Sequence, residues 1–380
     1  MNDDIAYIEA QSQGLQVQAA NQKLLHAELS SLLETISISG DELQPLRSVS
    51  MESGLREIED SLVRLYKAML TIDPSLGASS SRPSEDGSIA TSRPGGYGNS
   101  EIGRMRVLQE KKDVYKNETT QFLSRLKPFL QVKFAAAIDE TQKALEEEKG
   151  GKLTRTAGKV KMDPRNHDLA REKLWKFGPL MLFAREVDRF EWEELMKMYE
   201  TVAKPLYQNE FRDVVFGWKR IVRKPTGDEG EILFTAQAEK QQEGLATTAR
   251  KLTVKRSKTL LRSPTSDNSS KTSIDKNDGR VQPFDVFQGL LEETIPIIIM
   301  EQNFLVDFFH VSSLEQHDFP DAVAASSPNS RRGGDLRRAR VMDPDRDLAT
   351  RVRLTMEEIF SFYQPDMQAL VGWTIASDPL

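Results

Sequence analysis

The sequence contains no cysteine among its 380 residues. This absence excludes disulfide bonds, thiolate metal sites and cysteine nucleophiles, and it is typical of proteins from reducing compartments. Histidine is also scarce, and none of the four histidines has a helix-spaced partner of the metalloprotease type. No nucleophile elbow or phosphate-binding loop is complete either. We therefore predict no metal site, no cofactor and no enzymatic activity.

Long apolar runs and an excess of positive charge are missing as well. The longest apolar run lies near Ile295–Met300, contains Pro296 and is bracketed by glutamates. Because a helix needs about 20 apolar residues to cross a bilayer, we predict no transmembrane segment. The first ten residues include two aspartates and no apolar run, so they do not fit a secretory signal. The net charge of −6 argues against nucleic acid as a partner.

What the sequence does have is helical periodicity combined with 29% charged residues. No alternating strand pattern appears, so we predict an all-α fold. Heptad helices would precede an elongated helical-bundle rod with long disordered insertions. The predicted parts are heptad helices (1–74), a linker (75–100), a long helix (101–149), a helical bundle (163–222), a disordered insertion (223–283) and a continuation of the bundle (284–380).

The clearest pattern lies between residues 55 and 72. Apolar side chains alternate there at spacings of three and four, which fills the a and d positions of about two and a half heptads. Such a stripe is useful only when a partner helix covers it. We predict it as a partner-binding stripe, which consists of Leu55, Ile58, Leu62, Leu65, Met69 and Ile72.

A second, weaker stripe belongs to a helix predicted over residues 3–38. It is interrupted by glutamines at positions 11, 18 and 22, and polar residues in a seam can fix register and partner choice at a cost in stability. The two helices could pack on each other as a hairpin or enter a multi-chain bundle, and the pattern leaves both open. The predicted partner-binding residues of this stripe are Ile8, Leu15, Leu25, Leu29, Leu32 and Ile36.

Glycine and proline suggest where helices end. We predict a stop at Gly40, a kink or break at Pro128, boundaries at Pro179 and Pro205, and an interruption at Pro365. Residues 320–342 are predicted to be a linker, in spite of an arginine cluster formed by Arg331, Arg332, Arg337, Arg338 and Arg340.

One basic segment stands out within the predicted insertion. Its basic residues have no acid among them, while leucine and valine are interspersed. It is either a solvated loop or a contact for acidic phospholipid, which adds about 1 kcal/mol per basic residue. Phosphorylation at the adjacent Ser263 would weaken such a contact. The possible lipid-binding residues are Arg250, Lys251, Lys255, Arg256, Lys258 and Arg262.

Several segments resemble a known family. Residues 9–18 (EAQSQGLQVQ) followed by 21–25 (NQKLL) are similar to the coiled-coil start of the Sec-three subunit of the exocyst, in its fungal branch. The later segments 180–188 (LMLFAREVD), 205–207 (PLY) and 301–304 (EQNF) are similar too. The resemblance covers the helical segments of nearly the whole chain.

The resemblance implies a function that the residue patterns alone do not give. Family members are subunits of a hetero-octamer that tethers secretory vesicles to the plasma membrane, at sites of polarised growth. Their N-terminal coiled coils join those of other exocyst subunits, and no catalytic residues are implied. The family also implies an N-terminal lipid- and GTPase-binding domain and further C-terminal helices, which we expect this chain to lack. The alternative is a general coiled-coil scaffold of another trafficking or cytoskeletal complex.

Overall fold

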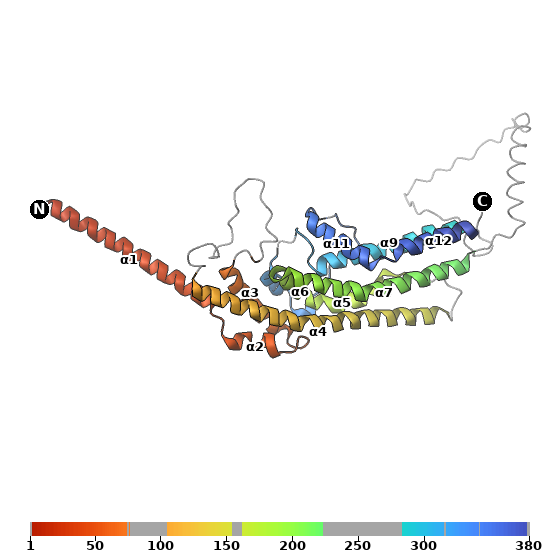
Figure 1. Cartoon of the computed structure of the whole chain (residues 1–380), viewed down its shortest axis with the longest axis horizontal. Coiled ribbons are helices and arrows are strands. Elements are labelled where there is room, and N and C mark those ends of the chain that lie inside the picture. The colour runs from red at the N-terminus through yellow and green to blue at the C-terminus, as the bar shows by residue number, and fades with distance from the viewer. Residues whose placement is uncertain are drawn as a thin grey trace, which may run out of the picture. The chain divides into compact units, whose positions relative to one another are not determined.

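The computed structural model describes residues 2–73, 76, 105–153, 162–222, 283–314, 317–341 and 343–377. The elements of these residues are α-helices and short 3-10 helices (Figure 1), so the all-α prediction is confirmed for the described part of the chain. The predicted linker 75–100 and insertion 223–283 lie outside the described residues, apart from residues 76 and 283.

Three helices form the N-terminal part: α1 (Asn2–Ile36), α2 (Gly40–Ser48) and α3 (Leu55–Ile72). The first helix does end shortly before Gly40, at Ile36, but Gly40 is not its cap, because it begins α2. Ser39 caps this helix: its Oγ accepts a hydrogen bond from the Glu42 N–H at 3.4 Å, and its own N–H donates to the Glu42 carboxylate at 2.9 Å. This reciprocal pair is a capping box, which starts a helix where the glycine suggested an end.

The middle of the chain contains two long helices with shorter ones between them. The elements are α4 (Arg106–Leu153), η3 (Pro164–His167), α5 (Asp168–Leu174), η4 (Trp175–Phe177), α6 (Gly178–Val187) and α7 (Arg189–Ile221). Pro179 does lie in the first turn of α6, but α4 continues through Pro128 and α7 continues through Pro205. The boundary at Pro205 is therefore wrong. Burial of its neighbours Ala203 and Leu206 helps to offset the roughly 3 kcal/mol that an interior proline costs.

The last part contains α9 (Pro283–Phe308), α10 (Phe319–Ala325), η5 (Pro328–Ser330), α11 (Arg346–Ile359) and α12 (Tyr363–Ser377). The helical stretch near the end divides just ahead of Pro365, between α11 and α12. In contrast, residues 320–342 are not simply a linker. They include most of α10 and all of η5, and the side chain of Arg331 is buried.

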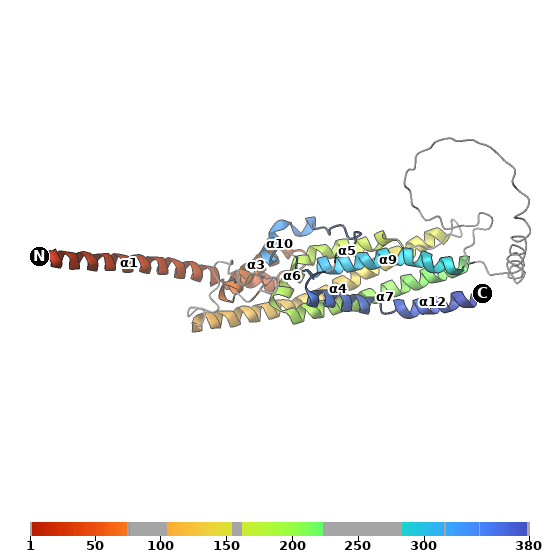
Figure 2. The ribbon, with the colours of Figure 1, turned by 90° about the horizontal axis from the view of Figure 1, so that it is seen from above.

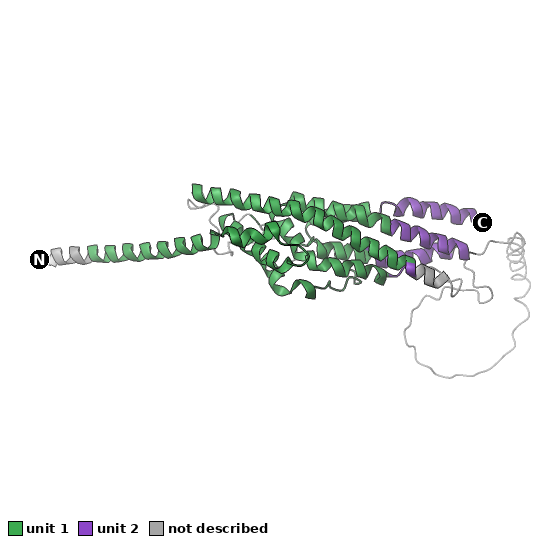
Figure 3. Cartoon of the chain, turned by 90° about the horizontal axis from the view of Figure 1, so that it is seen from below, with its two compact units in different colours: residues 1–146, 164–206, 299–359 green, residues 147–163, 207–298, 360–380 purple. Residues whose placement is uncertain are grey.

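The chain divides into two compact units, which Figure 3 distinguishes by colour. Unit 1 comprises residues 1–146, 164–206 and 299–359, and unit 2 comprises residues 147–163, 207–298 and 360–380. Three helices (α4, α7 and α9) contribute residues to both units.

Aromatic side chains fill the core of unit 1. Tyr66 of α3 lies 5.8 Å from Phe319 of α10, measured between ring centroids, and Phe319 lies 5.1 Å from Phe183 of α6. Phe183 in turn lies 6.0 Å from Phe122 of α4. These edge-on and tilted arrangements are the favoured ones for aromatic pairs. The core therefore joins α3, α4, α6 and α10.

Unit 2 has a smaller aromatic core. Phe211 of α7 lies 5.2 Å from Tyr363 of α12, and Tyr363 shares a hydrogen bond of 3.1 Å with Thr294 of α9. Helix α9 approaches α7 at Gly289, where a Cβ atom would lie 2.2 Å from the Trp218 ring. Only glycine permits this approach, so α9 packs one face on α7 and presents another face away from it.

Truncation of Leu62 to alanine should destabilise unit 1 strongly, because this side chain is fully buried. We expect a loss of about 2–5 kcal/mol in the free energy of unfolding, measured by urea denaturation followed by circular dichroism. The matched control is Leu24→Ala on α1, where the side chain is 63% exposed and the expected change is within about 0.5 kcal/mol. Equal effects of the two changes would contradict this description of the core.

Candidate helix-pairing surface

Most of α1 is not covered by other described residues of the chain. Every residue from 11 to 28 is exposed to solvent, including Leu15 at 61% and Leu25 at 50%. Figures 1 and 2 show α1 extending away from the other helices of unit 1 as a single helix. The predicted partner-binding residues Leu15 and Leu25 are therefore accessible, whereas the side chain of Ile8 lies outside the described set.

The exposed apolar residues of α1 occupy two faces. At 3.6 residues per turn, Leu15, Leu25 and Leu29 fall on one side of the helix. Val17 and Leu24, which are 60% and 63% exposed, are seven residues apart and fall on a second side, roughly 120° away. A helix with two apolar faces is suited to contacts with more than one neighbouring helix.

The C-terminal end of α1 is fixed to the rest of unit 1. Leu29 is half-buried, while Leu32 and Ile36 are buried. The Tyr115 hydroxyl of α4 donates to the Ile36 carbonyl and accepts from the Ile38 N–H at 3.3 Å. Burial raises the pKa of Tyr115, so the phenol stays protonated and can donate. This contact sets the direction in which α1 leaves the unit.

The stripe of α3 is covered within the chain, which corrects the prediction that it binds a neighbouring subunit. Its side chains contact α1, α2, α4 and α10 in place of a separate protein. Because the chain's own helices bury this apolar surface, no partner helix can reach it in this fold. The exposed fractions are 6% or less for Leu55, Ile58, Leu62, Leu65, Met69 and Ile72.

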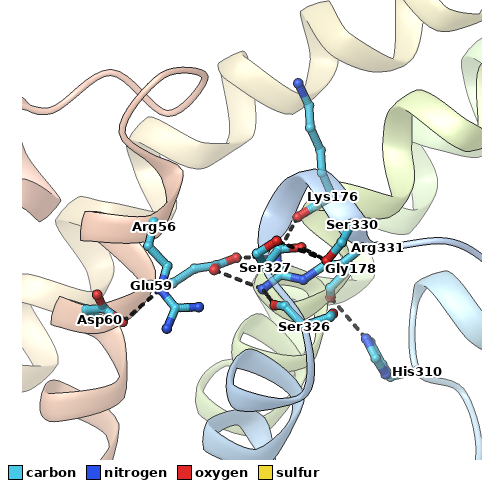
Figure 4. Close-up of polar contacts among 10 residues, drawn as sticks. All are labelled: Arg56, Glu59, Asp60, Lys176, Gly178, His310, Ser326, Ser327, Ser330 and Arg331. Carbon is cyan, nitrogen blue, oxygen red and sulfur yellow. Dashed lines mark hydrogen bonds and ion pairs between the residues drawn. The ribbon is translucent and has the colours of Figure 1, made fainter.

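An ion pair at the border of α3 is also buried (Figure 4). The Arg331 guanidinium donates to both carboxylate oxygens of Glu59, with Nη2 at 2.9 Å from Oε2. Arg331 also donates to the carbonyl oxygens of Lys176 at 2.8 Å and Ser326 at 3.1 Å. Glu59 is 0% and Arg331 7% exposed. The pair fixes the segment after α10 against α3. The sequence analysis assigned Arg331 to a linker and did not single out Glu59, because each has the pattern of an ordinary surface charge.

The desolvation of the Glu59 carboxylate costs more free energy than its interactions with Arg331 offset. Loss of water around the carboxylate raises its pKa, and the hydrogen bonds and charge of Arg331 oppose this without cancelling it. A buried pair of this kind gives geometric definition more than stability.

Two family models match this chain. Residues 1–71 match the model described as "Exocyst complex component Sec3, coiled-coil", and residues 308–380 match "Exocyst complex component Sec3, C-terminal". Both ends of the chain therefore match models of one family, the Sec3 component of the exocyst. No curated protein matches, and no solved structure matches. The resemblance to this family is therefore confirmed, and the fungal branch stays a prediction.

The two Sec3 matches meet in the core of unit 1. The coiled-coil match contains both the exposed stripe of α1 and the buried stripe of α3. The C-terminal match contains Phe319 and Arg331, which contact Tyr66 and Glu59 of α3. Segments from the two matched regions thus complete one folded body.

Two other buried carboxylates, those of Glu301 and Glu200, have structural partners. Glu301 of α9 accepts from Arg171 of α5 at 3.0 Å and from the Tyr199 hydroxyl of α7 at 2.6 Å. Glu200 accepts from Thr355 of α11 at 2.7 Å. These bonds tie α5, α7, α9 and α11 together.

Two classes of site are absent from the described part of the chain. In the residues that the structure describes, no group of three or more histidine or carboxylate side chains is placed to hold a metal ion. Among the described helices, none combines the length and apolar character needed to cross a bilayer. The basic segment 250–262 lies outside the described residues.

Replacement of Arg331 by methionine should leave Glu59 buried without its counter-ion. We expect a loss of about 3–5 kcal/mol in the free energy of unfolding. In the double variant Glu59→Leu/Arg331→Met, both charges are gone, so stability should return to the wild-type value or exceed it.

Because the pKa of Glu59 is raised in the folded chain, the wild type should lose stability relative to the double variant as pH rises from about 4. Urea denaturation across pH measures both effects, and a double variant as unstable as Arg331→Met would refute this account.

Proposed function

We propose that this Sec3-family chain is a non-catalytic exocyst subunit that takes part in tethering secretory vesicles to the plasma membrane. The matches to the two Sec3 models support membership of the exocyst complex, and the tethering role follows from what that family implies. The same reasoning puts the chain in the cytoplasm, peripherally at the plasma membrane and at sites of polarised growth. Its partners are the other exocyst subunits, and it needs no cofactor.

We further propose that α1 binds helices of those subunits through residues 11–29. The observation that carries this proposal is the exposure of Leu15, Leu25 and their neighbours on a part of α1 that no other described residues cover. A helix in water owes most of its stability to packing of its apolar face. Each leucine contributes about 1.5–3 kcal/mol once it is buried by a partner.

The second apolar face indicates more than one partner helix. Val17 and Leu24 cannot contact a helix that is centred on Leu15 and Leu25, because they lie roughly 120° around the axis. A bundle of at least three helices would cover both faces. The glutamines at positions 11, 18 and 22 then limit which helices fit, because a buried amide needs a matching polar partner.

The buried residues of α3 are not part of this surface. Substitution of Ile58, Leu62 or Leu65 with a charge would unfold unit 1, so a loss of assembly in such variants would say nothing about binding. The contact between segment 250–262 and acidic phospholipid stays a prediction from composition.

Replacement of Leu15 and Leu25 by aspartate should weaken assembly with the other exocyst subunits by at least about tenfold, because two apolar anchors become charged. Co-purification at several protein concentrations measures the loss. The chain itself should keep its urea denaturation midpoint, since both side chains are exposed.

The matched control is Gln16→Asp with Lys23→Asp. These residues are also exposed on α1 but lie on its polar side, away from both apolar faces. The control should assemble as well as the wild type. Wild-type assembly of the Leu15/Leu25 variant would remove α1 from the mechanism.

A further inference from the structure

The loop after α10 contains an exposed serine that is followed by proline. Helix α10 ends at Ala325, and Ser327 precedes Pro328, the first residue of η5. Ser327 is exposed, and its backbone is extended, with φ −70° and ψ 152°. This conformation is the usual one ahead of a proline. Proline-directed kinases act on an accessible serine in an extended segment followed by proline, so Ser327 has the features that such an enzyme requires.

A buried guanidinium lies beside this serine. Arg331 is 7% exposed, and its Nη2 donates to the Ser326 carbonyl oxygen at 3.1 Å. Figure 4 shows Ser326, Ser327 and Ser330 around the Arg331 side chain. The hydroxyl oxygens of Ser327 and Ser330 are 2.9 Å apart. A group attached to Ser327 Oγ therefore has the Ser330 hydroxyl and this guanidinium as neighbours.

The Arg331 guanidinium has one donor left over. Its Nη1 donates to Glu59 Oε1 and the Lys176 carbonyl oxygen, and its Nη2 donates to Glu59 Oε2 and the Ser326 carbonyl oxygen. Its Nε is buried and has no hydrogen-bond acceptor within the described part of the chain. Because a guanidinium has five N–H donors and a buried donor without an acceptor costs free energy, Arg331 is able to bind one further acceptor.

A second arginine lies on the same turn. Arg332 is exposed, and its Nη1 donates to the carbonyl oxygens of Asn329 at 3.2 Å and Arg331 at 2.8 Å. These bonds fold its guanidinium back over the turn. The segment from residue 326 to residue 332 contains these two arginines and no acid. The turn therefore favours an anion as the further acceptor.

We propose that Ser327 is a phosphorylation site for a proline-directed kinase and that its phosphate binds Arg331 and Arg332. The reaction forms a bond between Ser327 Oγ and the γ-phosphorus of ATP. The bond from that phosphorus to the β,γ-bridging oxygen breaks, ADP leaves with the bridging oxygen, and the hydroxyl proton passes to a base of the kinase. The phosphate adds about 1.5–2 negative charges and three acceptor oxygens, which form one to three charge-assisted hydrogen bonds opposite arginines.

The phosphate would strengthen the attachment of the segment after α10 to α3. Arg331 already connects the Ser326 carbonyl oxygen to Glu59 of α3. A phosphate on Ser327 gives the same guanidinium a further acceptor on the loop, while Glu59 keeps both of its bonds. Because burial raises the pKa of Glu59, its carboxylate offsets the charge of Arg331 less as pH falls, and the phosphate supplies negative charge there. This effect belongs to the folded chain alone and does not depend on the proposed role in the exocyst.

The first test is modification of the folded full chain. The sequence has two Ser-Pro pairs, at 263–264 and 327–328, so Ser263→Ala leaves Ser327 as the sole serine with this motif. A purified proline-directed kinase with ATP should add one phosphate, which mass spectrometry of the digest locates at Ser327. Pro328→Ala is the matched control and should lower the rate by at least about tenfold. If the folded chain stays unmodified while a peptide of residues 322–332 is phosphorylated, the proposal is overturned.

The second test measures whether the phosphate stabilises the fold. Phosphorylation of the Ser263→Ala chain should lower its equilibrium constant for unfolding about tenfold at neutral pH, measured by urea denaturation. The arginines lower the second pKa of the phosphate in the folded chain below its unfolded value of about 6. The gain is therefore fully present above about pH 6 and is lost as pH falls through the folded value.

The matched control for Arg331 is the double variant Glu59→Leu/Arg331→Met in the same background. It keeps the net charge of the chain, and it is expected to fold because neither charge is left without its partner. Phosphorylation should stabilise this variant by no more than about twofold, because only the exposed Arg332 is left at the turn. Equal stabilisation of the two chains, or a chain with Arg331 that becomes less stable when phosphorylated, would overturn the proposal.

Discussion

The carboxylate of Glu59 and the guanidinium of Arg331 are brought together out of water, and this contact constrains how α3 and the segment after α10 are aligned in unit 1. Each charge alone would be unacceptable in a core, so neither segment can adopt its position without the other. The pair connects residues 272 positions apart in the sequence. Around it, Tyr66 and Phe319 bury the apolar surface that supplies the driving force. The hydrophobic contacts favour compaction, and the ion pair selects one alignment of α3 against the segment after α10.

The two N-terminal heptad stripes differ in whether the chain's own described helices cover them. The α3 stripe has no polar interruption, and the chain's own helices cover it. The α1 stripe contains glutamines and stays exposed over residues 11–28. Burial of a continuous apolar stripe within a single fold gives the larger gain in free energy, because every side chain of the stripe contributes to it. An interrupted stripe gives less energy but more discrimination, which suits recognition between different subunits.

Periodicity was sufficient to predict helices, because the spacing of apolar residues is a local property. It could not tell whether a stripe such as Leu55 to Ile72 is covered by the same chain or by another one. That question depends on contacts with Phe319 and Arg331, which lie far away in the sequence. The proline at 205 misled for the same reason: its cost is local, but the packing that offsets it is tertiary. Arg331 was overlooked because an arginine among serines and glycines resembles a solvated linker. The segment 250–262 could be described only by its composition.

The bond between Tyr115 and the end of α1 has a mechanical consequence. From Ile36 back to residue 11 the helix rises about 37 Å, at 1.5 Å per residue. A tilt of only about 10° at the phenol would displace the far end by roughly 6 Å, more than one turn of a helix. The junction therefore acts as a pivot at the short end of a lever. A small rotation at this junction would therefore move residues 11–29, the surface that we propose for partner binding, over a large distance, and the contacts of Leu32, Ile36 and the Tyr115 hydroxyl would bear any load applied there.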